Sequence, residues 1–416
     1  MSRRLLVPSR LARKAPSRWS PKAAVSRLLV LALVVAGVTV LGAGSAVASH
    51  VGCGDTVTTD TTLDSDLVNC PNNGIIIGAD NITLDLNGHT IDGNGMPVDP
   101  CPEGATCDVG VDNSAGHSGV TVEGGSIRQF SVGVLVTGGA ARNRLYQLAV
   151  SDTTDIGIFV ADSTDSVIEK TSMSDPGVNG LVLLDSQQAL VARNSVSGTT
   201  GYAVFMFGVD DSRIQHNKLD ADQHGFLLGD SARNLVQHNA VSHTGGGIEV
   251  VEGATFNRVE HNRFTGILVG DASDNLIRHN LVAATYAFGI ILDGAVRTTL
   301  DRNIVTAPGP AIIVTKLEAA VAPQDTIVSG NHVTSKLGDG ILVDNGATGT
   351  LLVRNLAIRS GDDGIDVDAP ATTVTRNIAN HNHDLGIEAV PGVIDGGGNH
   401  AAGNGNPAQC INIDCT

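Results

Sequence analysis

The sequence predicts an all-β fold, a single-domain right-handed parallel β-helix of about 14 rungs. Three features predict this solenoid: a repeat of mostly 22 to 24 residues, an apolar position near the start of every repeat, and a recurring asparagine. We expect the β-helix to span residues 74–400, between an N-terminal cap at residues 49–73 and a C-terminal cap at residues 401–416.

Each repeat begins with a short segment of the type Gly-Ile-x-Val. The residue after the first position is apolar in every repeat, and the residue two positions further on is apolar in all repeats but one. Because side chains of a strand alternate between its two faces, these two columns are expected to face inward and form the core. The fourteen repeats begin at Gly74, Gly110, Gly133, Gly157, Gly180, Ala203, Gly225, Gly247, Gly266, Gly289, Ala311, Gly340, Gly364 and Gly386.

A second column lies 13 to 15 residues further on in nearly every repeat and is asparagine in eleven of fourteen. Stacked strands put equivalent residues about 4.8 Å apart, so inward amides can hydrogen-bond from rung to rung. Asparagine also tolerates a tight turn. We therefore expect a structural ladder formed by Asn87, Asn194, Asn217, Asn239, Asn262, Asn280, Asn303, Asn331, Asn355, Asn377 and Asn399.

Four histidines, His216, His238, His261 and His279, directly precede ladder asparagines on successive repeats. Beside an inward amide they are expected to face solvent. Such a row suits a transition metal or a response to pH, but no carboxylate or cysteine accompanies it at ligand spacing. A solvated column is therefore the favoured interpretation.

Residues 1–48 have the features of an export signal. The first 27 residues carry eight Lys or Arg and no acid, and an apolar run, Leu28 to Leu41, leads to the small residues Ala46-Val47-Ala48. The run is short for a membrane span, and the small residues match a signal peptidase site. We expect a removed signal peptide and a secreted, periplasmic or cell-surface protein; an uncleaved anchor is the alternative.

The charge balance limits the partners of the exported chain. Removing residues 1–48 leaves 18 Lys and Arg against 43 Asp and Glu, a net charge of −25. This surface repels nucleic acid and anionic lipid, so we expect no nucleic-acid partner and no membrane association after signal removal. Acidic polysaccharides are also repelled unless a divalent cation mediates.

All six cysteines lie in the exported part. An even number outside the cytoplasm favours disulfides, and pairing of near neighbours is the simplest of fifteen connectivities. No Cys-x-x-Cys motif indicates a metal site. The expected disulfides cross-link the two ends of the solenoid and one insertion, and they join Cys53 with Cys70, Cys101 with Cys107, and Cys410 with Cys415.

The column between the two core columns points outward, yet it is apolar in ten of fourteen repeats. A long exposed apolar strip is an aggregation hazard, so we expect a loop, the N-terminal tail or another protein to cover it. Self-association into a homo-oligomer is one way to do so. The strip includes Phe159, Val182, Phe205, Leu227, Leu268 and Ile291.

Acids replace apolar residues in this outward column at its last two positions, Asp366 and Glu388. With Asp363, His383 and Asp384 they form the predicted catalytic group. Carboxylates on adjacent rungs repel unless a proton or a cation intervenes, so Asp363, Asp366 and Glu388 are also the predicted ligands of Ca²⁺. The alternative is that Gly-Asp-Asp-Gly and Asn-His-Asp are ordinary turns of a solenoid.

By its repeat, its asparagine column and its opening segment from Asn81 to Gly93, the chain resembles the right-handed parallel β-helix superfamily over about residues 74–400. This superfamily includes pectate lyases, polygalacturonases, mannuronan epimerases, phage tailspikes and a copper-maturation protein of nitrous oxide reductase. The resemblance implies the fold, whereas the chemistry differs among its members.

Two short motifs carry a narrower resemblance. Gly361-Asp362-Asp363 is similar to the paired aspartates of polygalacturonases, but the other elements of that family are missing. His383-Asp384 resembles the second half of a mannuronan epimerase motif whose first half is absent. Two functions stay open: a protein that binds or acts on polysaccharide, at most as a uronate lyase or epimerase, or a non-catalytic structural or adhesive solenoid.

Overall fold

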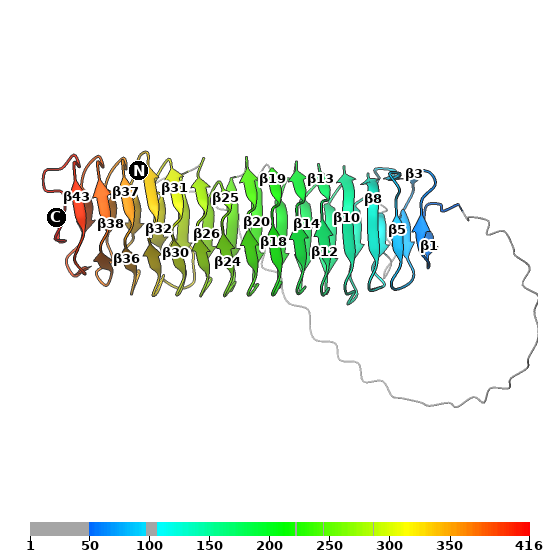
Figure 1. Cartoon of the computed structure of the whole chain (residues 1–416), viewed down its shortest axis with the longest axis horizontal. Helices are drawn as coiled ribbons and strands as arrows, with labels where there is room; N and C mark the ends of the chain where they lie inside the picture. Colours follow the sequence, from blue (N-terminus) through cyan, green and yellow to red (C-terminus); the bar gives the residue numbers. More distant parts are fainter. Residues whose placement is uncertain (1–49, 97–105, 221–222, 244, 286) are drawn as a thin grey trace, which may run out of the picture. The chain divides into compact units, whose positions relative to one another are not determined.

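The computed structural model describes residues 50–96, 106–220, 223–243, 245–285 and 287–416, and these form one right-handed parallel β-helix (Figure 1). The expected signal peptide and Cys101 lie outside the described residues. Every rung contributes one strand to a first face and, on most rungs, one short strand each to a second and a third face. In the described part of the chain, no helix is long and apolar enough to cross a membrane.

The first face is a parallel sheet of fifteen strands. In order they are β1 (Asp55–Val57), β4 (Ile75–Ile77), β7 (Val109–Asn113), β9 (Val132–Val136), β11 (Ile156–Ala161), β14 (Asn179–Leu184), β17 (Tyr202–Phe207), β20 (His224–Gly229), β23 (Gly246–Val251), β26 (Ile267–Gly270), β29 (Ile290–Asp293), β32 (Ile312–Thr315), β35 (Ile341–Val343), β38 (Ile365–Val367) and β41 (Ile387–Ala389).

The second face stacks shorter strands in the same way, and two long strands bend from it into the third face. Its strands are β2 (Thr61–Thr62), β5 (Thr83–Asp85), β8 (Thr121–Arg128), β10 (Arg144–Ser151), β12 (Val167–Glu169), β15 (Leu190–Ala192), β18 (Arg213–Gln215), β21 (Leu235–Gln237), β24 (Arg258–Glu260), β27 (Leu276–Arg278), β30 (Thr299–Asp301), β33 (Ile327–Ser329), β36 (Leu351–Val353), β39 (Thr373–Thr375) and β42 (Ile394–Asp395).

The third face continues most rungs after a corner of two residues, and the first two rungs and the last rung after a corner of four. Besides the ends of β8 and β10, its strands are β3 (Leu67–Cys70), β6 (Thr90–Gly93), β13 (Ser172–Ser174), β16 (Ser195–Ser197), β19 (Lys218–Asp220), β22 (Ala240–Ser242), β25 (Arg263–Phe264), β28 (Leu281–Ala283), β31 (Ile304–Ala307), β34 (His332–Ser335), β37 (Leu356–Ile358), β40 (Ile378–Asn380) and β43 (His400–Ala402).

The first face has one strand more than the fourteen repeat starts. Strand β1 pairs in register with β4, and Asp55 lies opposite Ile75. The segment that we expected to be only a cap therefore also adds a rung. The repeat pattern did not indicate this rung because an acid, Asp55, occupies the position that is apolar in every later repeat.

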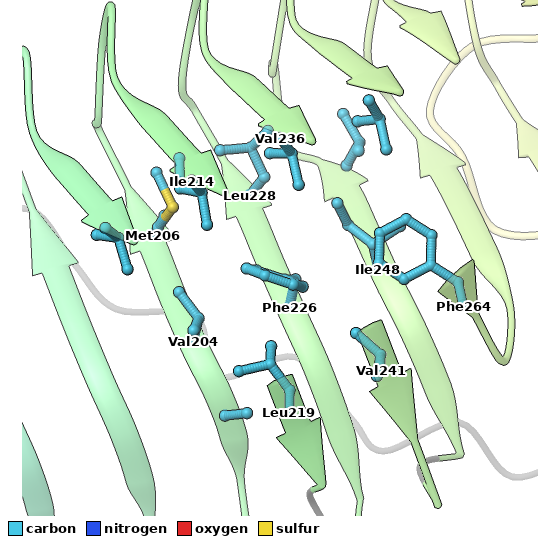
Figure 2. Close-up of a cluster of buried hydrophobic side chains, with 14 of the residues drawn as sticks. Val204, Met206, Ile214, Leu219, Phe226, Leu228, Val236, Val241, Ile248 and Phe264 are labelled. Atoms are coloured by element: carbon cyan, nitrogen blue, oxygen red, sulfur yellow. The ribbon is translucent and has the colours of Figure 1, made fainter. Parts of the chain in front are cut away.

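The inward columns form one continuous core, as predicted. Figure 2 shows side chains of several rungs meeting inside the solenoid, among them Val204, Phe226, Ile248 and Phe264. The rings of Phe226 and Phe264 pack edge to face with centroids 6.3 Å apart. Stacking buries each such side chain against its equivalents above and below, which favours a uniform register along the whole solenoid.

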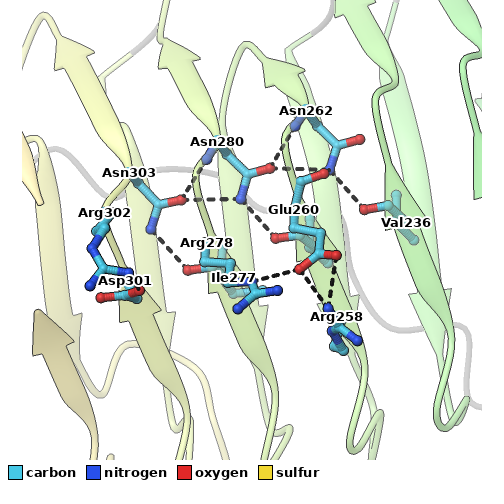
Figure 3. A network of polar contacts seen from close by, with 11 residues as sticks. Val236, Arg258, Glu260, Asn262, Ile277, Arg278, Asn280, Asp301, Arg302 and Asn303 are labelled. Carbon is cyan, nitrogen blue, oxygen red and sulfur yellow. Dashed lines mark hydrogen bonds and ion pairs between the residues drawn. The ribbon is translucent and has the colours of Figure 1, made fainter. Parts of the chain in front are cut away.

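The asparagine ladder is confirmed from Asn194 to Asn399, and Figure 3 shows its members Asn262, Asn280 and Asn303. Asn87, the first predicted member, is exposed and instead donates from Nδ2 to the carbonyl of Leu63 at 3.3 Å. At the corner between the second and third faces, Asn280 Nδ2 donates to Asn303 Oδ1 at 3.1 Å, and the backbone N–H of Asn280 donates to the same oxygen at 3.0 Å. The Nδ2 group of Asn303 also donates to the carbonyl of Ile277 at 2.9 Å. Each amide thus uses both its donor and its acceptor, so the column is buried without unsatisfied groups.

Two disulfides match the expected pairs, Cys53–Cys70 and Cys410–Cys415. Cys107 is also disulfide-bonded, but the expected partner Cys101 lies outside the described residues. Disulfides persist in oxidising compartments, so the two described bonds support a location outside the cytoplasm.

The outward apolar strip of the first face is in register, with Phe159 opposite Val182, and Leu268 opposite Ile291. Val182 is buried by its neighbours, whereas Phe159, Phe205, Leu227, Leu268 and Ile291 remain half-buried. Coverage of this strip in the functional particle therefore stays a prediction.

Candidate functional site

Six carboxylates gather where the first face ends on its last rungs. We call Asp339, Asp362, Asp363, Asp366, Asp384 and Glu388 the acidic cluster. Asp366 and Glu388 project outward from β38 and β41 and lie opposite each other in register. The others come from the turns that precede β35, β38 and β41, so the stacking of three rungs brings the whole group together.

The turn aspartates are fixed by bonds to the backbone of neighbouring rungs. Asp339 Oδ1 accepts the backbone N–H of Asp363 at 3.1 Å, and Asp363 Oδ1 accepts that of Leu385 at 2.7 Å. Asp363 is only 4% exposed. These bonds hold the carboxylates in position and explain part of the cluster as a structural feature of the turns.

Carboxylate oxygens of five of these acids converge in two groups, and Glu388, which was predicted as a ligand, belongs to neither. One oxygen each from Asp339, Asp363 and Asp366 lie within 4.8 Å of one another, and the same holds for Asp362, Asp363 and Asp384. Calcium takes oxygen ligands at about 2.3–2.6 Å, so oxygens at this separation can contact one ion. Asp363 belongs to both groups and is the centre of the cluster.

The proximity of these acids changes their ionisation. Burial raises the pKa of the Asp363 carboxyl to about 8, and Glu388 and Asp339 contribute to the rise although the N–H of Leu385 opposes it. Burial raises the pKa of Asp366 to about 7, with further contributions from surrounding carboxylates. The pKa of Asp339 is raised for the same reasons. The cluster therefore favours a bound proton or cation near neutral pH.

The structure brings together only part of the predicted catalytic group. Asp363, Asp366, Asp384 and Glu388 lie in the acidic cluster, but the imidazole of His383 is exposed, and among the described residues no hydrogen bond or ion pair joins it to these acids. Next to the buried Asn382, its position in the turn directs it to solvent. A histidine–acid pair at this site is therefore not formed.

A second polar group, which the sequence analysis missed, interrupts the apolar strip in the middle of the first face. Glu249 Oε2 accepts the hydroxyl of Tyr202 at 3.0 Å, and Glu249 Oε1 lies 3.0 Å from His224 Nδ1. The rings of Tyr202 and His224 are 4.7 Å apart. Burial raises the pKa of Tyr202, and the charge of Glu249 adds to the effect, so the phenol stays protonated and donates.

This group borders a pocket of about 220 Å³. Polar His224 and Glu249 form one side, and Leu268, Phe288 and Ile291 are among the apolar residues of the other. Glu249 fixes one ring nitrogen of His224, which leaves the second nitrogen for a proton or a ligand. Comparing the residues before each repeat start would have revealed this group, because Tyr202 and His224 lie opposite each other in register.

The model of one protein family matches residues 87–266 and 253–360 of this chain. The chain belongs to this family, which is described as periplasmic copper-binding protein (NosD). Most of the acidic cluster lies beyond the matched residues, since only Asp339 falls within them. None of the curated proteins compared with the chain matches it.

Solved structures resemble the chain at low identity. The catalytic domain of a GH87 α-1,3-glucanase in complex with nigerose is 13% identical, with a TM-score of 0.48, over 72% of this chain and 64% of that domain. The A-module of Azotobacter vinelandii mannuronan C-5 epimerase AlgE4 is 12% identical, with a TM-score of 0.44, over 73% of this chain and 90% of that module.

The tailspike protein of E. coli bacteriophage HK620, in complex with a pentasaccharide, is 11% identical, with a TM-score of 0.44, over 87% of this chain and 73% of the tailspike. Of the glucanase domain described above, the chain spans less than two thirds. All three are right-handed parallel β-helix proteins, and the likeness concerns the fold alone.

Proposed function

We propose that the protein is exported and binds an acidic polysaccharide through a divalent cation, calcium, held by the acidic cluster. The observation that carries this proposal is the convergence of carboxylate oxygens of Asp339, Asp363 and Asp366 within 4.8 Å. Oxygen-only ligand sets are those that calcium prefers.

Charge supports the mediation by a cation. The chain without residues 1–48 carries a net charge of −25, which repels a polymer of uronates. A cation that neutralises the raised-pKa carboxyls of Asp363 and Asp366 still has coordination positions for a carboxylate of the ligand. Calcium thereby makes an acidic surface compatible with an acidic polysaccharide.

The described residues do not fit copper, which the family description names. Copper(I) prefers several thiolate and thioether ligands together. Met173 and Met206 are each 1% exposed in the core, Met96 is the one exposed methionine of the described residues, and the described cysteines are in disulfides. The imidazoles of His238 and His261 stack with centroids 5.3 Å apart and planes 14° from parallel. Nitrogen ligands bind in the plane of the ring, so stacked rings do not converge on one ion.

Acid–base chemistry on the same polymer is the second candidate function. The pairing of Glu249 with His224 beside a pocket favours it, because an oriented imidazole is the usual general base for removing a proton. A lyase or C5-epimerase of uronate polysaccharides would use such a base. Ultraviolet absorbance of unsaturated uronates and NMR of the treated polymer test these two reactions, and His224→Gln is expected to abolish either one.

Binding of fluorescent polygalacturonate to the exported chain, in calcium and in chelator, tests the first proposal. We expect tighter binding in calcium, and we expect Asp363→Asn with Glu388→Gln to remove that increment. Asp155→Asn is the matched control, since this exposed acid has no side-chain partner among the described residues. Equal affinity of the parent in both buffers would contradict the proposal.

A further inference from the structure

A row of basic side chains follows the corner between the second and third faces. It occupies the residue directly before the ladder position, where the backbone is left-handed, on every rung from Lys170 to Arg376 except one, where Gly330 interrupts it. The side chains are exposed, except His279, which is half-buried. We call this row the basic edge: Lys170, Arg193, His216, His238, His261, His279, Arg302, Arg354 and Arg376.

The charge around the basic edge is opposite to that of the whole chain. The strands that flank it, from β12 and β13 to β39 and β40 with their corners, hold ten Lys or Arg but only four Asp or Glu, in a chain of net charge −17. The cations are Lys170, Arg193, Arg213, Lys218, Arg258, Arg263, Arg278, Arg302, Arg354 and Arg376.

Arginines pair with three of the four acids of this surface, and the fourth, Asp220, hydrogen-bonds to His243. Glu169 pairs with Arg193, Glu260 with Arg258 and Arg278, and Asp301 with Arg302. Within the described residues, no ion pair involves Arg213, Lys218, Arg263, Arg354 or Arg376. This surface therefore carries cations whose charge no nearby acid balances.

The geometry of the edge is regular and fixed. The buried ladder anchors every corner, so the cations repeat at about the rung spacing of 4.8 Å. In the middle, the imidazoles of His216, His238, His261 and His279 stack with centroids 5.0–5.3 Å apart. A shallow hollow of about 470 Å³ lies beside His238, His261 and His279, with Arg263 at its border.

We propose that the basic edge binds a linear polyanion, an acidic polysaccharide, by direct contacts between its carboxylates and these cations. A row of basic side chains at a fixed spacing, flanked by Arg213, Lys218 and Arg263 without ion pairs among the described residues, is complementary to a chain with an anionic group on every unit or two. Screening over about 8 Å at physiological salt limits the repulsion from acids on more distant parts of the solenoid.

Nucleic acid fits this surface less well than a polysaccharide. Single-stranded nucleic acids are bound by aromatic side chains on which bases stack. The only Phe, Tyr or Trp in the flanking strands is Phe264, which is 1% exposed. Tyr146, at the end of the edge beside Lys170, already has the cationic groups of Arg144 and Lys170 at 3.7 and 4.9 Å from its ring centroid. The edge therefore offers charge along its length but few rings for stacking.

The test measures binding of polygalacturonate to the exported chain in chelator, which removes any contribution from calcium at the acidic cluster. At pH 7.5 we expect binding that is about tenfold weaker in Arg354→Gln with Arg376→Gln than in the parent. The matched control is Arg142→Gln with Arg359→Gln. These two arginines are also exposed and also have a left-handed backbone, but they lie at other corners of the solenoid. Melting temperatures verify that all variants fold.

Three results would overturn the proposal: no binding in chelator, equal weakening by the control pair, or tighter binding of single-stranded DNA than of polygalacturonate. Polygalacturonate binding in calcium but not in chelator would refute the proposal for the basic edge and leave the acidic cluster as the binding site. Equal binding in chelator and in calcium would refute only the proposal that calcium mediates binding.

Discussion

The asparagine ladder and the acidic cluster use the same geometry with opposite consequences. In both, polar side chains stack in register on successive rungs, as Asn280 does on Asn303 and Asp366 on Glu388. An amide has a donor and an acceptor, so each member satisfies the next. An ionised carboxylate only accepts, so a stack of carboxylates repels itself. A solenoid can therefore stack neutral amides on successive rungs without repulsion. Carboxylates stacked in the same way repel one another unless a proton or a cation neutralises part of their charge.

Converting one ladder amide to an acid should have the largest effect. In Asn303→Asp, the oxygen that replaces Nδ2 would face the acceptors Asn331 Oδ1 and Ile277 O in a position that is 0% exposed. We expect a loss of about 3–5 kcal/mol in the free energy of unfolding at pH 7.5, measured by denaturant titration. A loss below about 1 kcal/mol would show that the ladder tolerates a charge.

The reverse change in the acidic cluster should stabilise the chain. Asp363→Asn keeps the oxygen that accepts the N–H of Leu385 and removes a charge from the centre of the cluster. In chelator at pH 7.5 we expect a gain of about 1–3 kcal/mol in the free energy of unfolding. Asp155→Asn, the control with the same change of charge, should leave stability within about 0.5 kcal/mol.

The pH dependence of stability should reveal the same repulsion. Because the pKa of Asp363 is raised to about 8 and that of Asp366 to about 7, the folded state holds their protons more tightly than the unfolded state. Their contribution is complete below about pH 4 and is lost as pH rises through 7 and 8. Melting curves in chelator should fall over this window, and Asp363→Asn should flatten the fall. A parent whose stability rises from pH 5 to 8 would contradict these shifts.

The exposed histidine stack should contribute least to stability. His238→Gln removes a ring that stacks on two neighbours at the surface, without altering the buried Asn239 beside it. We expect a change within about 0.5 kcal/mol in thermal unfolding. A larger loss would mean that the column serves the fold rather than a ligand.

The sequence predicts the fold well because the repeat specifies register. Once Gly289 and Ile290 are aligned with their equivalents, alternation determines which side chains are buried, and stacking places Asn280 against Asn303. The same logic brought Asp366 beside Glu388. The rung that begins at Asp55 was not predicted, because a polar residue occupies the position that is apolar in the other rungs.

The candidate sites were harder to predict because they depend on turns. Register does not specify where a turn side chain points, so His383 was expected beside the acids but is exposed. The group of Tyr202, His224 and Glu249 joins residues up to 47 positions apart, on three successive rungs. Composition gives no sign of it, and the coupling of carboxyls around the buried Asp363 requires knowledge of burial as well as sequence.

The central claim, that the acidic cluster holds a cation, is tested most directly by thermal melting at pH 7.5 with calcium and with chelator. The parent is compared with the double variant Asp366→Asn, Glu388→Gln. Calcium at a hundred times its dissociation constant should stabilise the parent by about 2.7 kcal/mol and the variant much less. In chelator the variant should melt above the parent. A parent that melts at one temperature in both buffers would contradict the claim.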